Sequence, residues 1–166
     1  MGRGATVALG NVWYQARIEA SKANEKLRSR FGAADEAGMS EDAIKNTELG
    51  LEKQMPVDKA VILADLYGAP YLLNHYCLHE CPIGRNRPIS DEILSIEQVS
   101  VRLLKRLRIS DIDELKEKLI DIADDGKITE EEVQDLQEIQ KHLDGVYKSI
   151  SQLRTIVEQI TGRNRE

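Results

Sequence analysis

Apolar residues recur at helical spacing along most of the chain, and their intervals predict a series of short helices followed by one long helix. The clearest pattern lies near the C-terminal end, where the apolar positions step alternately by three and four residues. This spacing is typical of a heptad seam, in which an apolar stripe of one helix packs against another helix. The seam consists of Leu136, Ile139, Leu143, Val146, Ile150, Leu153, Val157 and Ile160.

The seam has two interpretations. It can pack inside its own chain against the two helices that precede it, as a three-helix bundle, or it can pair with another chain. Because the seam is longer than either preceding helix, we expect at least part of it to be buried between chains, which makes the protein a homo-oligomer. Parallel and antiparallel pairing both remain open.

Two short helices joined by a tight turn are predicted in the first third of the chain. Ser29 can cap a helix over residues 30–37, and Gly38 can end it because glycine best serves a left-handed residue after a helix. Ser40 can cap a second helix, which Gly50 ends in turn. Two helices around such a turn form the helix-turn-helix layout, whose second helix enters the major groove of DNA in the proteins that use it.

Further helices are predicted on both sides of a boundary. One helix starts after Pro56, and another begins at Pro70 and stops by Pro82. Residues 82–88 contain two prolines, one glycine and two arginines, which predicts a domain boundary there. Beyond it, Ile93, Leu94, Val101, Leu104 and Leu107 mark one helix, and Ile112, Leu115, Leu119 and Ile122 mark a second.

The composition supports an all-α protein. Of 166 residues, 41% are hydrophobic and only 4% aromatic, so the core depends on aliphatic side chains, which favours helices over a sandwich or barrel. We expect two domains, residues 1–88 and residues 89–166. No apolar run approaches the roughly 18 residues of a membrane span, and two cysteines do not make a disulfide framework. The expected location is a reducing cytoplasm, without membrane association.

Residues 29–68 resemble the Xre/Cro-type helix-turn-helix of bacterial and phage repressors. The matching features are Ser29, Ala34, Gly38, Ser40, Ile44, Glu48, Gly50 and Pro56, followed by the segment LADLYG. The whole chain is also similar to a group of such regulators from Gram-positive bacteria and their mobile elements, through its YC…ECPIGR segment and its helical tail.

This resemblance implies a lambda-repressor-like domain over residues 1–88 and a helical oligomerisation domain over residues 89–166. It also implies a transcriptional regulator that binds double-stranded DNA as a dimer or higher oligomer, and it gives Glu48 a structural role. Carried onto this sequence, the implied DNA contacts are Ser29, Arg30, Ser40, Glu41, Asp42, Lys45 and Asn46.

The charge pattern opens an alternative function. Residues 1–34 carry six basic and two acidic side chains, which is a mild indication of a polyanionic partner. However, Glu41 and Asp42 place two acids at the start of the second helix, where they would repel phosphate. The alternative is therefore a protein-interaction adaptor that retains the fold without reading bases. No nucleophile elbow, P-loop or dinucleotide fingerprint occurs, so we do not expect an enzyme.

The segment HYCLHEC offers four metal-ligand types on one helix. His75 and His79 share one face, and Cys77 and Cys81 share another face about 200° away, so one helix cannot direct all four at one ion. We therefore expect no metal and no cofactor. A two-ligand half-site completed by another chain, or a redox role of the cysteines, remains open as an alternative.

The segment DIADDGKITEEE, residues 121–132, resembles a calcium-binding loop but lacks one ligand. Its third position is Ala123, which offers no side-chain oxygen to a cation that needs six or more. The same residues suit a turn between helices, with Gly126 ending one helix and with Thr129 and Glu132 forming a capping box for the next. The segment therefore predicts a turn rather than a calcium site.

Overall fold

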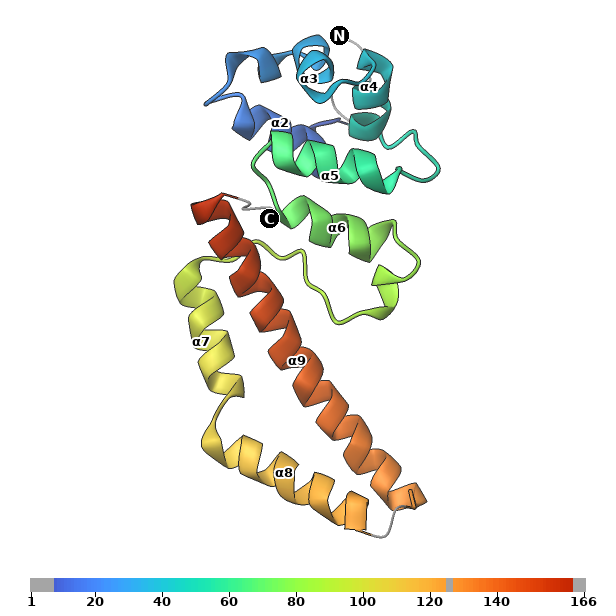
Figure 1. The fold of residues 1–166 in the computed structure, drawn as a ribbon, viewed down its shortest axis with the longest axis vertical. Coiled ribbons are helices and arrows are strands. Elements are labelled where there is room, and N and C mark those ends of the chain that lie inside the picture. The colour runs from blue at the N-terminus through green and yellow to red at the C-terminus, as the bar shows by residue number, and fades with distance from the viewer. Residues whose placement is uncertain (1–7, 125–126, 163–166) are drawn as a thin grey trace. The chain divides into compact units, whose positions relative to one another are not determined.

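The computed structural model describes residues 8–124 and 127–162, and all regular structure in these ranges is helical (Figure 1). Eight α-helices and two 3-10 helices occur, and no strand is found in the described parts of the chain, which confirms the all-α prediction. The helices belong to two compact units. One contains the described residues up to 86 and those from 158 onward, and the other contains those between 87 and 157.

Two helices of the first unit, over residues 30–37 and 41–49, start at their predicted caps. The Ser29 hydroxyl accepts a hydrogen bond from the N–H of Gly32 (3.0 Å), and the Ser40 hydroxyl accepts one from the N–H of Ala43 (3.2 Å). Each bond satisfies a backbone donor that the helix itself leaves unpaired. The elements of this unit are α2 (Val12–Ala20), η1 (Glu25–Arg28), α3 (Arg30–Ala37), α4 (Glu41–Leu49), α5 (Val57–Leu66), α6 (Tyr71–His79) and η2 (Gly84–Asn86).

Small side chains allow the helices of this unit to approach closely. Ala33 and Ala34 of α3 are buried, and they share a core with Ile44 of α4 and Leu63 of α5. Trp13 of α2 is buried in the same core at 3% exposure, although the helical pattern of the sequence did not single it out. The core is therefore assembled from several short helices rather than from one dominant helix.

A buried ion-pair network joins three of these helices. Glu48 of α4 accepts a hydrogen bond from Nε of Arg17 on α2 (2.5 Å) and another from Nε of Arg30 on α3 (2.7 Å). Arg17 also donates from Nη1 to the carbonyl oxygens of Leu27 (2.8 Å) and Arg28 (3.0 Å), between α2 and α3. The side chains of Arg17 and Glu48 are 3% and 1% exposed, so both charges depend on these partners.

The second unit consists of three helices, of which two precede the long one. Ile93 and Leu94 lie before the first of them and not in it, because Ser95 caps that helix and forms a capping box with Gln98. Thr129 and Glu132 form the predicted capping box, whereas Asp125 and Gly126 lie outside the described residues. The helices are α7 (Ile96–Arg106), α8 (Ile109–Asp124) and α9 (Glu130–Thr161), whose last residues belong to the first unit.

Polar contacts set the direction of the second unit's helices. Arg106, at the end of α7, lies across α9 at Gly145, where its guanidinium occupies the position that a Cβ atom would need. Its carbonyl oxygen is 2.9 Å from Nε2 of His142. Lys118 of α8 donates to Glu138 near the start of α9 (2.8 Å). Positions later in α7 and α8 thus meet positions earlier in α9, so α7 and α8 run antiparallel to α9.

Among the described residues, no helix is both long enough and apolar enough to cross a bilayer.

Replacement of Glu48 by Gln is expected to lower the free energy of unfolding by about 3 kcal/mol, because it leaves the buried Arg17 guanidinium without its counter-charge. Urea unfolding followed by the fluorescence of Trp13, the only tryptophan of the chain, measures the loss. The control is Glu25→Gln, which removes the exposed pair with Arg28 and is expected to leave the midpoint unchanged. Equal midpoints for the two variants would contradict a stabilising role of the network.

Candidate nucleic-acid interface

The turn between α3 and α4 consists of Gly38, Met39 and Ser40. Gly38 has a φ of 64°, in the left-handed region that L side chains rarely adopt. Its N–H donates to the carbonyl of Asp35, and the N–H of Met39 donates to the carbonyl of Ala34 (2.9 Å). These bonds close the end of α3, and the half-buried Met39 packs against the core, so the start of α4 has a defined position.

Four of the implied DNA contacts on α4 and its cap are exposed side chains. Ser40, Glu41, Asp42 and Lys45 all face solvent at the start of the helix. Lys45 Nζ lies 3.4 Å from the Asp42 carboxylate, one turn earlier, so the single lysine of this helix already has an acidic neighbour. The positive end of the α4 dipole and its cap are well suited to an anion, whereas the two carboxylates oppose one.

Asn46 lies in a different environment from these four exposed residues. It is half-buried and lines a cavity of about 420 Å³ between the start of α2, the end of α4 and helix α6. Asn11 lines the same cavity, and its side-chain amide donates to the carbonyl of Thr47 (3.0 Å). A contact between Asn46 and adenine stays a prediction.

The two implied contacts at α3 differ in their freedom to meet a phosphate. Ser29 is exposed, and its oxygen caps α3. Arg30 is 28% exposed and donates to Glu48, so its charge is already part of the buried network. Because that network depends on both arginines, Arg30 positions α3 as well as facing solvent.

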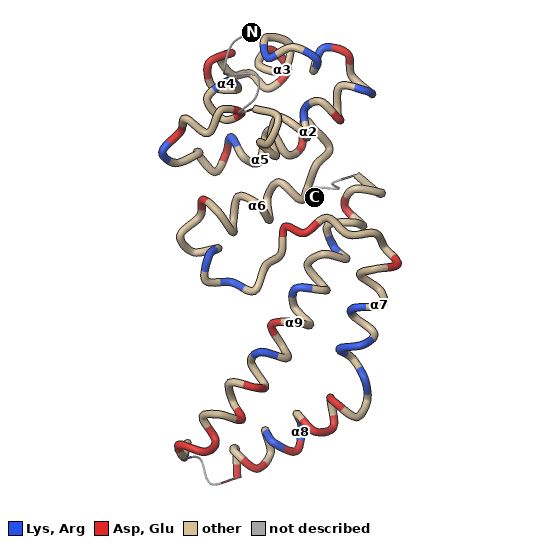
Figure 2. Tube along the Cα trace, turned by 180° about the vertical axis from the view of Figure 1, so that it is seen from behind, with Lys and Arg blue, Asp and Glu red and all other residues tan. Residues whose placement is uncertain are grey.

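Most described basic side chains near α3 have an acidic partner. Lys26 lies 2.5 Å from Glu36, and the hydrogen bond to this carboxylate raises the pKa of the lysine. Arg28 lies 3.2 Å from Glu25. Figure 2 shows acidic and basic positions intermixed along this part of the chain. Although residues 1–34 contain more basic than acidic side chains, acidic side chains therefore lie among the basic ones on the surface near α3.

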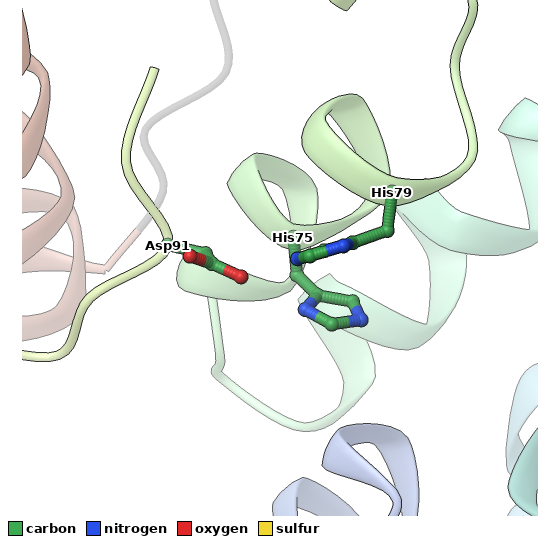
Figure 3. Close-up of side chains that lie close together, drawn as sticks. All are labelled: His75, His79 and Asp91. Carbon is green, nitrogen blue, oxygen red and sulfur yellow. The ribbon is translucent and has the colours of Figure 1, made fainter. Parts of the chain in front are cut away.

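The imidazole rings of α6 lie together, apart from its cysteines. The ring centroids of His75 and His79 are 4.3 Å apart with a tilt of 38° (Figure 3), and both residues line the cavity beside Asn46. Cys77 and Cys81 are half-buried free thiols that pack against the core. This arrangement separates the histidines from the cysteines, so the four residues of the segment do not converge on one ion.

Burial also affects the chemistry of one thiol. It raises the pKa of Cys77, and the neighbouring Cys81 raises it further, so the neutral thiol predominates at neutral pH. A metal-binding or redox-active cysteine requires the thiolate, which this environment disfavours. The environment therefore supports a packing role for Cys77.

Sequence interpretation missed Arg17, although it is the central partner of Glu48. The available signal was a charged residue on a helix face shared with Trp13 and Ala16. Lys59 was missed as well; it is 6% exposed and donates to the carbonyl of Ala43 (2.7 Å) and to Glu52 (2.5 Å).

Comparison with protein-family models, with curated proteins and with solved structures finds no match to any of them.

Substitution of Gly38 by Ala is expected to destabilise the protein by about 1 kcal/mol, since a Cβ meets no atom there and the cost comes from the left-handed backbone alone. Thermal unfolding followed by circular dichroism measures the effect. Gly10→Ala is the matched control, because it also has open space but no positive φ. A Gly38→Ala variant as stable as this control would contradict the strain assigned to the turn.

In a Cys81→Ser background, Cys77 is expected to react with iodoacetamide more slowly than a free thiol at pH 7.5. Its raised pKa reduces the thiolate fraction, and the rate should increase as the pH rises. Mass spectrometry of the alkylated chain measures the rate, and the same variant in urea provides the unfolded reference. Reaction in the folded protein faster than in urea would show an activated thiol instead.

Proposed function

We propose that the chain is a DNA-binding transcriptional regulator with a helix-turn-helix of the Xre/Cro type. The observation that carries the proposal is the unit formed by α3, the turn from Gly38 to Ser40, and α4. Both helices are capped by serine, ended by left-handed glycine and packed on a shared core, and the start of α4 is exposed. A short helix held this firmly with its first turn in solvent suits insertion into a groove.

Phosphate contacts would supply most of the affinity. The free N–H groups at the starts of α3 and α4, with the hydroxyls of Ser29 and Ser40, suit backbone phosphates, which fix the register of a protein on DNA. Lys45 extends from the same exposed turn toward a phosphate or a guanine. Asn46 would read adenine, although its position beside the cavity requires its side chain to turn outward.

Oligomerisation would set the spacing of two such helices. Operators that are palindromic are read by dimers whose recognition helices lie about 34 Å apart, one turn of DNA. We propose that the helical second unit provides the contact between copies and that the heptad seam of α9 takes part in it.

A second candidate is an adaptor that binds protein rather than DNA. It is favoured by the exposed acids Glu41 and Asp42 at the start of α4 and by the ion pairs that neutralise Lys26 and Arg28. In this function α4 would present an acidic surface to a basic partner protein.

Gel retardation with genomic DNA fragments at low salt tests the regulator. We expect the wild-type chain to select specific fragments, and the double variant Glu41→Gln and Asp42→Gln to bind them about tenfold more tightly, because two carboxylates no longer repel phosphate. The matched control is Glu114→Gln with Glu117→Gln, which changes the net charge equally on exposed positions of α8. Absence of selective binding by every variant would exclude the regulator and leave the adaptor.

A further inference from the structure

The second unit buries very little apolar surface within its own chain. Among its described residues, Val99 and Ile139 are the only apolar side chains with a carbon skeleton larger than alanine that are buried. None of the 16 residues of α8 is buried, although its apolar positions recur at helical spacing. Three ordered helices with so small a core do not offset the conformational entropy lost on folding.

The heptad seam of α9 separates into two rows of different exposure. Ile139 is 3% exposed, and Val146 and Leu153, which follow it at intervals of seven, are half-buried, so this inner row faces α7 and α8. The other row leaves Leu143 and Ile150 53% and 51% exposed. The inner row and Leu136 are thus at least partly covered within their own chain, whereas Leu143 and Ile150 are about half exposed.

The exposed row of α9 lies on a definite side of the three helices. At about 100° per residue, Leu143 and Ile150 are turned about 120° and 100° clockwise from the buried Ser149 of α9, viewed from its N-terminus. On α8, Ile112 and Leu119 are turned by a similar angle, and in the same sense, from the side that contains Lys118. On α7, Leu104 is turned in the same sense, by about 140° from the buried Val99.

The antiparallel course of the helices brings these exposed residues to one face. In a pair of antiparallel helices, consider residues that are turned in the same sense from the contact side, with each helix viewed from its own N-terminus. These residues lie on the same side of the pair. In Figure 1, α7 and α8 follow one another along α9, and the unit has no further described helix to cover either face. The unit therefore has an apolar face on this side of its helices, termed here the open face. The open face comprises Leu104, Ile112, Leu119, Leu143, Tyr147, Ile150 and Val157.

We propose that the open face is covered by the open face of a second copy of this chain, so that two helical layers close into one bundle. The extent of the face fits this occupant. A half-exposed aliphatic side chain leaves on the order of 70 Å² uncovered, so seven residues supply the roughly 500 Å² of apolar surface that one side of a stable dimer needs. A second layer of the same kind has the same repeat of seven residues, which allows its side chains to interdigitate with these.

This interface specifies how the homo-oligomer of the proposed function forms, and it rests on that part of the proposed function. It does not depend on DNA binding by the first unit. The inner row then holds each chain together, and the open face joins the chains. The seam predicted from the sequence thus serves two contacts, one within the chain and one between copies.

Sedimentation equilibrium of the full-length chain over a range of concentrations tests the interface. We expect a dimer for the wild type and a monomer for Leu143→Glu with Ile150→Glu, with the dissociation constant increased at least about 100-fold. The control Gln137→Glu with Lys148→Gln alters the net charge by the same amount on exposed positions away from the open face and is expected to remain dimeric. A monomeric wild type, or a glutamate variant that still dimerises, would overturn the proposal.

A milder variant covers the case in which the glutamates unfold the second unit. Leu143→Ala with Ile150→Ala keeps helix-forming residues at both positions and is expected to weaken the dimer about tenfold or more while the wild-type helical content is retained. Trp13 fluorescence monitors the first unit separately. An unchanged dissociation constant for this variant would also overturn the proposal. Loss of DNA selectivity in a dimeric protein would affect the proposed function alone.

Discussion

The first unit depends on the contact between the Arg17 guanidinium and the Glu48 carboxylate. Both groups are almost fully buried, and each would be costly to bury alone. Arg17 also holds the carbonyls between α2 and α3, while Glu48 receives Arg30, so one pair of charges fixes three helices. Glu48 also affects Tyr67 in the same core. Burial raises the pKa of the Tyr67 phenol, and the negative charge of Glu48 raises it further.

This network constrains the candidate interface. The starts of α3 and α4 are local structures set by serine caps, but their mutual position is set by Glu48 and the small residues between them. Arg30 belongs both to the buried network, because it pairs with Glu48, and to the surface, because it lies partly in solvent. The backbone donors at the two helix starts are therefore held in a fixed arrangement.

Local features of the fold were predictable from the sequence, and long-range features were not. The limits of α3 and α4 follow from Ser29, Gly38 and Ser40, because caps act on residues within the same turn. The bond between Arg17 and Glu48 joins residues 31 positions apart, and nothing in the local pattern of α2 specifies it. The start of α7 was predicted too early, because Ile93 and Leu94 suit a helix by spacing but precede the Ser95 cap.

The heptad pattern predicted α9 but not its neighbours, since a period of seven identifies a stripe and not the helix that covers it. Strict periodicity has another consequence, which Gly145 counteracts. A helix with identical repeats can slide along its partner by seven residues and find equivalent contacts. At Gly145, the one glycine within α9, the Arg106 guanidinium crosses the helix in the space that a Cβ would need, so this position favours one axial alignment over the others. This position has a cost, because glycine weakens a helix by about 1 kcal/mol relative to alanine.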